Sequence, residues 1–301
     1  MNRESVLYKI RRWGQTVAFH LVSKKTLSKF YFKIVTKKTL DLENPKTLNE
    51  KIQWLKLYYL PSNPLVVQCT DKYQVREYIE QKGYANTLTK LLGVWENAKD
   101  IAWDALPDKF VLKCTHGCAY NLICKDKRLF DKKAATKQLN HWLKEDFSAF
   151  NVELHYGKIR SRKIICEEFL GEKLIDYKFF CFHGEPKFFY VSSDLVHDRQ
   201  AQMGFFEMNG NKIPLIRNDY ADIGAIELPN CYSEMVEEAR NLAREFPFVR
   251  VDFFFDGESF KFAELTFTPG AAMMPFNPPE YDLKFGDMLN IDDLLKKGKN
   301  S

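Results

Sequence analysis

Charged side chains recur at alternate positions in two apolar segments of this 301-residue sequence. The first segment, residues 249–255, contains Arg250 and Asp252, and the second, residues 260–267, contains Glu264. Alternate side chains of a β-strand share one face of a sheet, so both segments are predicted to be strands with a polar face. Buried charges are stable only when they are paired or bind a metal, and chemistry is therefore expected in this hairpin.

The register of the hairpin decides whether its two carboxylates meet. A shift of one residue turns the side chains of a strand to the opposite face. Opposition of Asp252 and Glu264 therefore requires an odd loop, and we predict one made of residues 257–259, closed by Asp256 and Phe260. A two-residue turn would place Glu264 on the other face.

In the predicted register, one face of the hairpin carries a guanidinium, two carboxylates and a hydroxyl. The residues expected on this face are Arg250, Asp252, Phe254, Phe260, Phe262, Glu264 and Thr266. Hard oxygen ligands of this kind are suited to Mg²⁺ that bridges phosphates. The alternative is a structural ion pair at the rim of a sheet, in which Arg250 neutralises Asp252.

Lys72 occupies a position that disfavours a cation. The sequence predicts a helix that begins at Thr70 or Asp71, runs to Lys82 and ends at Gly83. Lys72 would lie in the first turn, where the helix dipole repels positive charge. A phosphate shared between Lys72 and the free N–H groups of this turn would explain the position, whereas a solvated lysine stem is the structural alternative.

Lys113 lies in an apolar strand that is followed by a loop and a returning strand. The loop, residues 116–121, includes His116, Gly117 and Cys118. Such a hairpin can cover a triphosphate with its backbone N–H groups while the lysine ammonium contacts phosphate oxygens.

The same hairpin contains four residues of types that ligate zinc, namely Cys114, His116, Cys118 and Cys124. Their spacing differs from the usual C-x2-C patterns, and strand alternation would not bring them together, so no zinc site is expected. The seven cysteines of the chain are odd in number and lie mostly in apolar runs. This pattern favours a reducing cytoplasm over a disulfide framework.

Positive charge is concentrated near the N-terminus. Residues 1–40 contain ten Lys or Arg and one acidic residue, whereas the remainder contains 35 basic and 39 acidic residues. Interleaved apolar residues predict short amphipathic helices that could contact an anionic membrane surface or a polyanionic substrate. A solvated helical face packed on the body is the alternative. A nucleic-acid partner is not expected, because the remainder is acidic and contains no recognition motif.

The rest of the sequence must position these residues. With 45% hydrophobic residues the chain can form one large domain or two lobes, and it contains neither a predicted transmembrane helix nor a signal peptide. A capping box at residues 47–50 predicts the start of an amphipathic helix. Further predictions are a surface helix within residues 131–150, a hairpin turn at residues 183–184, a helix at residues 233–246, and an irregular substrate loop at residues 192–230 with a polar cluster of His197, Asp198 and Arg199.

Taken in order, these motifs resemble the ATP-grasp superfamily. Arg250-x-Asp252 followed by Glu264-x-Thr266-x-x-Pro269-Gly270 is similar to the end of D-alanine–D-alanine ligases. The chain as a whole resembles the TupA-like group found with bacterial surface-polysaccharide synthesis. This match covers residues 40–290 and is carried by residues 44–55, 71–73, 110–113, 250–252 and 264–266.

The resemblance implies an α+β ATP-grasp fold, with two α+β lobes whose sheets are largely antiparallel. We expect a basic helical arm at residues 1–62, an N-lobe with the phosphate lid at residues 63–170, and a C-lobe with the magnesium and phosphoryl site at residues 171–295.

The resemblance also implies a role for each site residue. The residues implied to bind ATP are Lys72 and Lys113 at the phosphates, His116, Gly117 and Cys118 in the lid, Glu167, Glu168, Phe169 and Leu170 in the adenine hinge, and Asp176 on the ribose side with Lys178 nearby. Mg²⁺ would be held by Asp252, Glu264 and Thr266, the last of which stands where the ligases have asparagine. Arg250, together with Lys113, would stabilise the transferred phosphoryl group.

The implied reaction is ATP- and Mg²⁺-dependent ligation of a carboxylate to an amine through an acyl phosphate. The expected substrates are a uronic acid of a surface polysaccharide, such as a capsule or O-antigen, and an amino acid or related amine, with His155, Tyr156 and Arg199 on the acceptor side. The expected location is the cytoplasm, with peripheral contact to the inner membrane face through residues 1–40. The alternatives are a glycosyltransferase, which the absence of Asp-x-Asp disfavours, and a nucleotide-binding partner without turnover.

Overall fold

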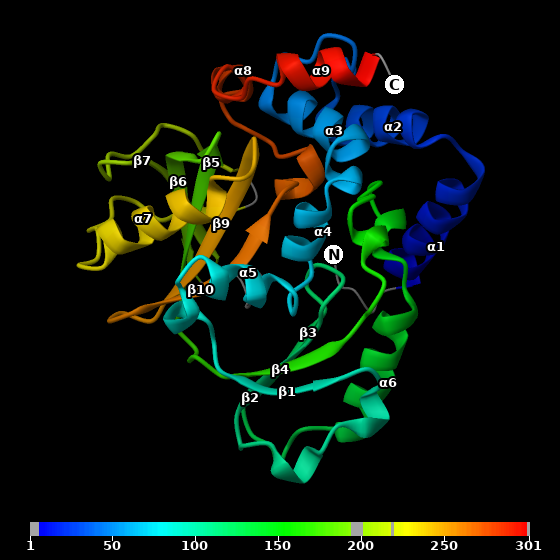
Figure 1. The fold of residues 1–301 in the computed structure, drawn as a ribbon, viewed down its shortest axis with the longest axis vertical. Coiled ribbons are helices and arrows are strands. Elements are labelled where there is room, and N and C mark those ends of the chain that lie inside the picture. Colours follow the sequence, from blue (N-terminus) through cyan, green and yellow to red (C-terminus); the bar gives the residue numbers. More distant parts are fainter. Residues whose placement is uncertain (1–5, 194–200, 218–219, 300–301) are drawn as a thin grey trace.

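Two mostly antiparallel sheets and a group of helices near the N-terminus make up the protein (Figure 1). The computed structural model describes residues 6–193, 201–217 and 220–299. The predicted cluster of His197, Asp198 and Arg199 lies outside these residues. The arrangement confirms the predicted α+β class with largely antiparallel sheets.

The smaller sheet contains four strands in the order β1-β4-β2-β3, and all neighbours are antiparallel. Its strands are β1 (Leu91–Trp95), β2 (Phe110–Cys114), β3 (Asn121–Cys124) and β4 (Ile164–Glu168). β2 and β3 form the predicted hairpin, in which Lys113 pairs with Asn121 beside the loop. Alternation along β2 buries Phe110 and Leu112 against Leu139 of the predicted helix, so Lys113 faces the other side.

The larger sheet has the strand order β10-β9-β5-β6-β7-β8, and only β7 and β8 are parallel. Its strands are β5 (Ile175–Phe182), β6 (Glu185–Ser193), β7 (Gln202–Glu207), β8 (Ala221–Asp222), β9 (Phe248–Phe255) and β10 (Phe260–Thr266). The predicted turn between β5 and β6 is formed by His183 and Gly184, whose φ angles of 50° and 85° are those that a two-residue hairpin requires. The prediction of an irregular loop at residues 192–230 is wrong for β7. Gly204 lies in the middle of this strand, and glycine weakens the sequence pattern of a strand.

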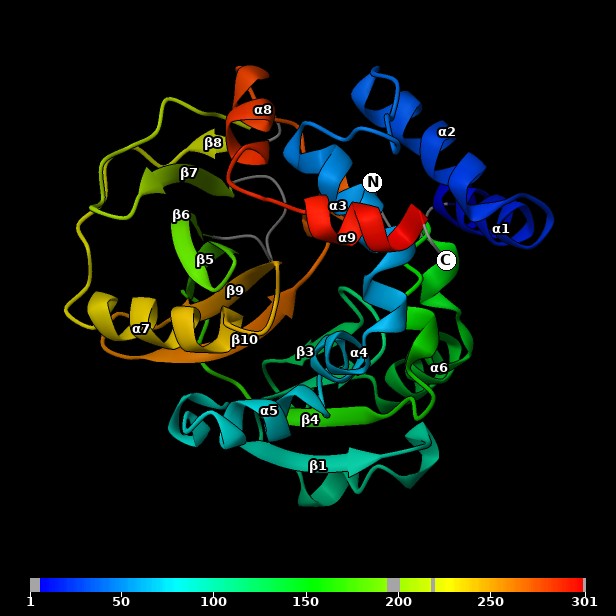
Figure 2. The same cartoon turned by 45° about the horizontal axis from the view of Figure 1, so that its top comes forward.

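Nine helices flank the sheets within the described residues (Figure 2). They are α1 (Val6–Leu21), α2 (Lys24–Thr36), α3 (Leu48–Tyr58), α4 (Pro64–Thr70), α5 (Val75–Gln81), α6 (Lys132–Lys144), α7 (Tyr232–Ala243), α8 (Glu280–Gly286) and α9 (Asp292–Lys299). The capping box at Thr47 and Glu50 is present at the start of α3. Within the described ranges, no helix combines the length and apolarity needed to cross a bilayer.

The predicted helix from residue 70 to residue 82 is wrong in its first part. α4 ends at Thr70 and α5 begins only at Val75. The carboxylate of Asp71 accepts the N–H groups of Tyr73 and Gln74 at 2.8 and 2.9 Å, which stabilises a turn instead of a helix. Lys72 therefore lies in the turn between two helices.

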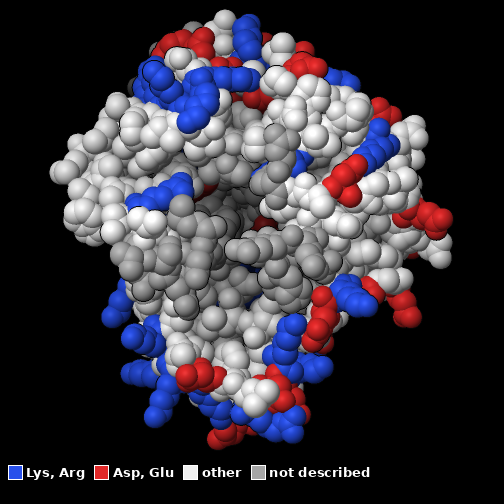
Figure 3. Space-filling model, turned by 180° about the vertical axis from the view of Figure 1, so that it is seen from behind, with Lys and Arg blue, Asp and Glu red and all other residues white. Residues whose placement is uncertain are grey.

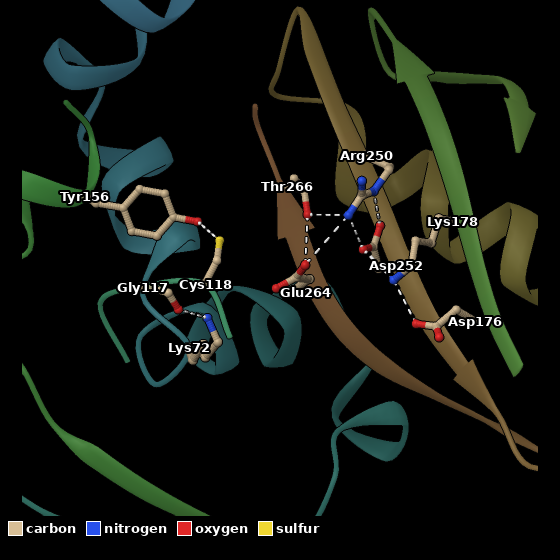
Figure 4. Close-up of polar contacts among 10 residues, drawn as sticks. All are labelled: Lys72, Gly117, Cys118, Tyr156, Asp176, Lys178, Arg250, Asp252, Glu264 and Thr266. Carbon is tan, nitrogen blue, oxygen red and sulfur yellow. Dashed lines mark hydrogen bonds and ion pairs between the residues drawn. The ribbon is translucent and has the colours of Figure 1, made fainter. Parts of the chain in front are cut away.

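The two faces of the larger sheet differ in what covers them. On one face the ring of Tyr232 in α7 contacts Phe179 and Phe189. On the other face Phe188 stacks on Phe285 of α8, at 4.0 Å between ring centroids. Away from α8, this second face carries charged side chains and faces the smaller sheet (Figure 4).

The connection between the two sheets lies near the expected boundary between the lobes. Residues 169–174 connect β4 of the smaller sheet to β5 of the larger one, so the expected boundary at residues 170–171 falls in this connection. The expected arm, residues 1–62, includes α3, whose Leu48, Ile52 and Leu55 are buried in the main core. α3 is therefore part of the body and not of a separate arm.

Candidate functional site

Asp252 and Glu264 oppose each other across β9 and β10, as the sequence predicts, but an odd loop is not the reason. The closing pair is Phe255 and Phe260, which leaves a four-residue loop instead of the predicted three-residue loop. The register then shifts at Ala263, which is an extra residue in β10 and forms a β-bulge. An even loop followed by one bulge gives the register that an odd loop alone would give.

The bulge reverses the alternation of side chains along β10, so even-numbered residues before and after it point to opposite faces of the sheet. Phe262 pairs with Phe253 on the core side, where the ring centroids of Phe253 and Phe260 lie 5.2 Å apart. The prediction that Phe260 and Phe262 share a face with Glu264 is therefore wrong. Beyond the bulge, Glu264 and Thr266 turn to the charged face.

Asp252 is a fully buried carboxylate held between two cations. Arg250 donates from Nε to Oδ1 at 2.7 Å and from Nη2 to Oδ2 at 2.6 Å, and Lys178 Nζ donates to Oδ2 at 3.0 Å. Lys178 also pairs with Asp176 at 2.7 Å (Figure 4). Burial alone would lower the pKa of Lys178 and of Arg250, but the neighbouring carboxylates raise both. The ion pair offered above as the structural alternative is thus present.

Glu264 and Thr266 extend this cluster toward the cleft. Thr266 Oγ1 donates to Glu264 Oε1 at 3.1 Å and accepts from Arg250 Nη2 at 3.0 Å. The side chain of Glu264 is 37% exposed. Burial acts to raise its pKa, but Lys72, Lys178 and Arg250 outweigh this effect and hold the pKa below its ordinary value. Glu264 is therefore an ionised carboxylate that is open to the cleft.

Lys72 approaches the cluster from the other side of the cleft. Its Nζ donates to the carbonyl oxygen of Gly117 at 2.7 Å, within the predicted lid loop (Figure 4). Its backbone N–H donates to the carbonyl oxygen of Thr115 at 3.1 Å, which ties the turn to the same loop. The ammonium group is close enough to lower the pKa of Glu264.

The lid residues differ in which parts face the cleft. Cys118 is exposed, and its Sγ lies 3.0 Å from the hydroxyl of Tyr156. The imidazole of His116 is buried and hydrogen-bonds the carbonyl oxygen of Trp142 at 3.0 Å. Burial lowers the pKa of His116 to about 4, so the ring is neutral. The side chain of His116 is therefore not available to contact a phosphate in the cleft.

Lys113 and Glu167 form a pair on the cleft side of the smaller sheet. Lys113 Nζ lies 2.5 Å from Glu167 Oε2, and Arg76 Nη1 lies 3.3 Å from Glu167 Oε1. The Glu167 side chain, which is predicted to belong to the adenine hinge, therefore forms ion pairs with Lys113 and Arg76. Arg76, which the sequence analysis did not single out, also donates to the carbonyl oxygen of Thr89 at 2.9 Å.

The other predicted hinge residues follow directly on β4. The backbone N–H of Glu168 donates to the carbonyl oxygen of Lys90 at 3.0 Å, and its carboxylate accepts the N–H of Lys90 at 3.1 Å. Phe169 and Leu170 are half-buried in the connection to β5. Of the four predicted hinge residues, Phe169 and Leu170 lie outside the smaller sheet, because β4 ends at Glu168.

The zinc ligands considered above do not converge. Cys114 and Cys124 are buried thiols that contact the carbonyl oxygens of Leu139 and Asp108. In the part of the chain that the structure describes, no group of three or more His, Cys, Asp or Glu side chains could hold a metal ion.

A deep hollow opens between the two sheets on the side opposite to that of Figure 1. Figure 3 shows the hollow, with atoms of acidic side chains visible inside it. The walls of the cleft carry both signs of charge, with Lys113 on the smaller sheet and the open carboxylate of Glu264 on β10. A polyanionic nucleotide with a divalent cation is complementary to such a cleft.

The sequence of the chain matches the model of one protein family, the TupA-like ATP-grasp family, over residues 50–290. The chain belongs to this family. The TupA-like ATP-grasp assignment confirms the resemblance drawn from the motifs, and with it the ATP-grasp fold and the class of ATP-dependent ligases. A comparison with curated protein sequences gives no significant match.

Solved structures similar to this TupA-like protein include several ligases. D-alanine–D-alanine ligase from Bacillus anthracis is 18% identical, with a TM-score of 0.48 over 85% of this chain and 77% of that chain. The ADP complex of N5-carboxyaminoimidazole ribonucleotide synthetase (purK) is 18% identical, with a TM-score of 0.45 over 86% and 60%. L-amino acid ligase from Bacillus licheniformis is 15% identical, with a TM-score of 0.42 over 78% and 51%.

The charged face of this ATP-grasp protein fits a magnesium ion. Mg²⁺ is usually bound by one or two carboxylates together with phosphate oxygens and water, so a protein site need not contain three acidic ligands. Asp252 and Glu264 supply two carboxylates on neighbouring strands, and Glu264 is open to the cleft. Glu264 would hold the ion, with the Thr266 hydroxyl beside it, whereas both oxygens of the buried Asp252 already accept hydrogen bonds from Arg250 and Lys178.

Three polar residues of α3 fix the turn that follows β10, and the sequence analysis did not identify them as part of the site. Asn49 Nδ2 and Gln53 Nε2 donate to the carbonyl oxygens of Met274 and Ala271, and Lys56 Nζ donates to that of Ala271 at 3.1 Å. Their spacing of four and three residues places them on one helix face. Polar side chains at core spacing in an otherwise apolar pattern are the signal that could have revealed them.

Proposed function

We propose that this protein is an ATP- and Mg²⁺-dependent ligase that activates a carboxylate as an acyl phosphate and joins it to an amine. The observation that carries the proposal is the apposition of Lys72, which is hydrogen-bonded to the lid, to Glu264 and Arg250 on the larger sheet (Figure 4). Phosphoryl transfer depends on positioning and charge neutralisation, which these groups supply without a covalent nucleophile.

The triphosphate would lie between the two sheets. Lys72 would contact it from the turn before α5, the backbone of Gly117 from the lid, and Lys113 from β2. Glu264 would hold Mg²⁺, which would supply charge neutralisation at the phosphates when bound. Arg250 would face the transferred phosphoryl group, because its guanidinium lies between the two carboxylates. The adenine would meet the backbone of Phe169 and Leu170, with Asp176 on the ribose side.

In the proposed reaction, a carboxylate oxygen attacks the γ-phosphorus and ADP leaves. The amine then attacks the carbonyl carbon, the C–O bond to phosphate breaks, and an amide and inorganic phosphate result. We assign the carboxylate to a uronic acid of a surface polysaccharide and the amine to an amino acid or related compound. The resemblance to the TupA-like group supports this choice of substrates.

The two described acceptor residues differ in accessibility. His155 is buried, and burial lowers its pKa to about 3. A neutral, enclosed imidazole cannot contact a saccharide, so the prediction of His155 as an acceptor-side residue is wrong. The Tyr156 hydroxyl lies against exposed Cys118 at the lid and remains the acceptor candidate.

The test is to supply purified protein with ATP, Mg²⁺, and a panel of uronic acids and amines. Release of ADP that requires both substrates is the expected result. When the carboxylate of the uronic acid is labelled with ¹⁸O, one labelled oxygen should appear in the released phosphate, because a carboxylate oxygen attacks the phosphorus. Release of UDP from a sugar nucleotide would instead establish the glycosyltransferase, and tight ATP binding without turnover would establish the non-catalytic partner.

A further inference from the structure

Helix α1 contacts the body through two polar side chains and through Phe19, which is buried in the main core. Arg12 Nη2 donates to the hydroxyl of Tyr120 at 3.3 Å, and the guanidinium lies 2.8 Å from the centroid of the Phe150 ring. Gln15 is buried and donates to the side chain of Asn151 at 3.1 Å. A surface helix ordinarily turns most of its apolar residues inward, whereas this helix turns most of them outward.

The outward side of α1 is apolar. Its exposed residues include Leu7, Trp13 and Leu21, with 73%, 70% and 79% of their surface accessible, and Ile10 and Val17 lie between them. At helical spacing these positions fall on one side of the helix, opposite Arg12 and Gln15. A contiguous exposed apolar face of this kind marks an interaction surface.

Helix α2 extends the same surface with both apolar and basic residues. Phe30, Ile34 and Val35 are about half exposed. The exposed lysines of this region are Lys25, Lys29, Lys33, Lys37 and Lys38. In Figure 3, basic side chains gather over α2 at the upper left, above the broad uncharged surface of α1.

We infer that α1 and α2 form a docking surface that lies flat on an anionic lipid bilayer. Apolar residues with an exposed Trp, flanked by lysines, match a helix that inserts its apolar face at the level of the headgroups. The charge complementarity selects the lipid over a second copy of this chain, because a symmetric contact would bring two lysine-rich surfaces together. This inference is independent of the proposed ligase activity.

The orientation of α1 distinguishes between two interpretations of the basic N-terminal region, a membrane-contacting surface and a solvated helical face packed on the body. If this region were a solvated face packed on the body, apolar side chains would be buried and basic ones would face water. The structure places Arg12 inward and Leu7, Trp13 and Leu21 outward. The contact between Arg12 and Tyr120 also joins the docking surface to the hairpin that carries the lid.

Sedimentation with vesicles tests the inference on the full chain. Wild-type protein should bind vesicles of phosphatidylcholine with phosphatidylglycerol, and bind vesicles of phosphatidylcholine alone far more weakly. The triple variant I10S/W13S/L21S should lose binding, whereas Leu129→Ser, which removes an apolar side chain that is 85% exposed elsewhere, should bind normally. Equal binding to both kinds of vesicle, or retained binding by the triple variant, would overturn the inference.

A second variant keeps the test informative if the triple variant folds poorly. K29Q/K33Q/K37Q changes only exposed lysines, and each lost charge should weaken binding to anionic vesicles about fivefold. Sedimentation equilibrium without lipid provides the competing outcome. A dimer of the wild type that the triple variant abolishes would show that this surface binds a second copy of the chain, and the inference would fail.

Discussion

Asp252 and Glu264 lie opposite each other in the β9–β10 hairpin, yet one carboxylate is sealed and the other is open. The side chain of Asp252 has no exposed surface, whereas that of Glu264 is 37% exposed. Asp252 neutralises two buried cations, and Glu264 faces the cleft. Substitution of Asp252 should therefore affect stability, and substitution of Glu264 should affect the reaction.

We expect Glu264→Gln to abolish catalysis while the fold persists. The change removes the carboxylate assigned to Mg²⁺ but keeps the size and the acceptor for the Thr266 hydroxyl. Turnover of ATP should fall at least about a hundredfold, a typical effect of losing one charge-stabilising group. ADP release and urea unfolding would measure the two effects. Glu258→Gln, in the loop of the same hairpin, is the matched control, and unchanged turnover in Glu264→Gln would refute the metal assignment.

We expect Asp252→Asn to destabilise the protein. Arg250 and Lys178 would remain buried without a compensating carboxylate between them, and loss of one partner in a buried pair costs about 3–5 kcal/mol. Urea unfolding followed by circular dichroism would measure the loss. Asp126→Asn breaks an exposed pair with Arg128 and should cost less than about 1 kcal/mol. Similar losses in both variants would show that the buried cluster is not a source of stability.

Glu238 should make stability depend on pH. Burial raises its pKa to about 7, and Thr87 Oγ1 donates to its carboxylate at 2.8 Å. Because the folded-state pKa lies above the unfolded value, the folded state binds more protons between these values. The stability that this group provides is complete below the unfolded pKa and is lost as the pH rises through about 7.

Glu238→Gln should therefore stabilise the protein at pH 8 and change little at pH 4. The amide keeps an acceptor for Thr87 but carries no charge, and the expected gain at pH 8 is about 1–3 kcal/mol. Free energies of unfolding at the two pH values would measure the difference. Glu237→Gln alters an exposed neighbour and should show no such gain. A variant that is less stable than wild type at pH 8 would contradict the raised pKa.

Much of the site could be predicted because its residues lie in regular strands. Alternation places Arg250 and Asp252 on one face, and pairing of β5 with β9 then brings Lys178 to Asp252. The turn of β2 into β3 likewise places Lys113 beside the lid. The shared face of Arg250 and Asp252 and the place of Lys113 follow from the period of a strand, whereas the meeting of Lys178 with Asp252 also needs the long-range pairing of β5 with β9.

Other features depend on contacts that a linear sequence does not reveal. Ala263 is an ordinary strand residue, and nothing local marks it as a bulge. Asp71 can cap a helix or close a turn, and the hydrogen bonds to Tyr73 and Gln74 decide for the turn. A lysine in a helix is usually solvated, so the burial of Lys56 was not foreseen.

Lys56 should be essential for the packing of two left-handed backbone segments. It is fully buried, and its Nζ donates to the carbonyl oxygens of Asn151 and Ala271 at 2.9 and 3.1 Å. The φ angles of Asn151 and Ala271 are 55° and 56°, a conformation that is unfavourable for residues other than glycine. A single ammonium group therefore holds both segments, and one of them leads out of the strand that carries Glu264.

Lys56→Met tests this role, because methionine fills a similar volume without a donor. Both buried carbonyl groups would lose the charged donor, and that of Ala271 would keep only Gln53, so we expect a loss of about 3 kcal/mol in the free energy of unfolding. Since the turn after β10 would loosen, affinity for ATP with Mg²⁺ should also fall, as measured by calorimetry. Lys46→Met, at an exposed position just before the same helix, should change neither quantity. If Lys56→Met unfolds at the same urea concentration as wild type, the two segments are held by other contacts and the assigned role is wrong.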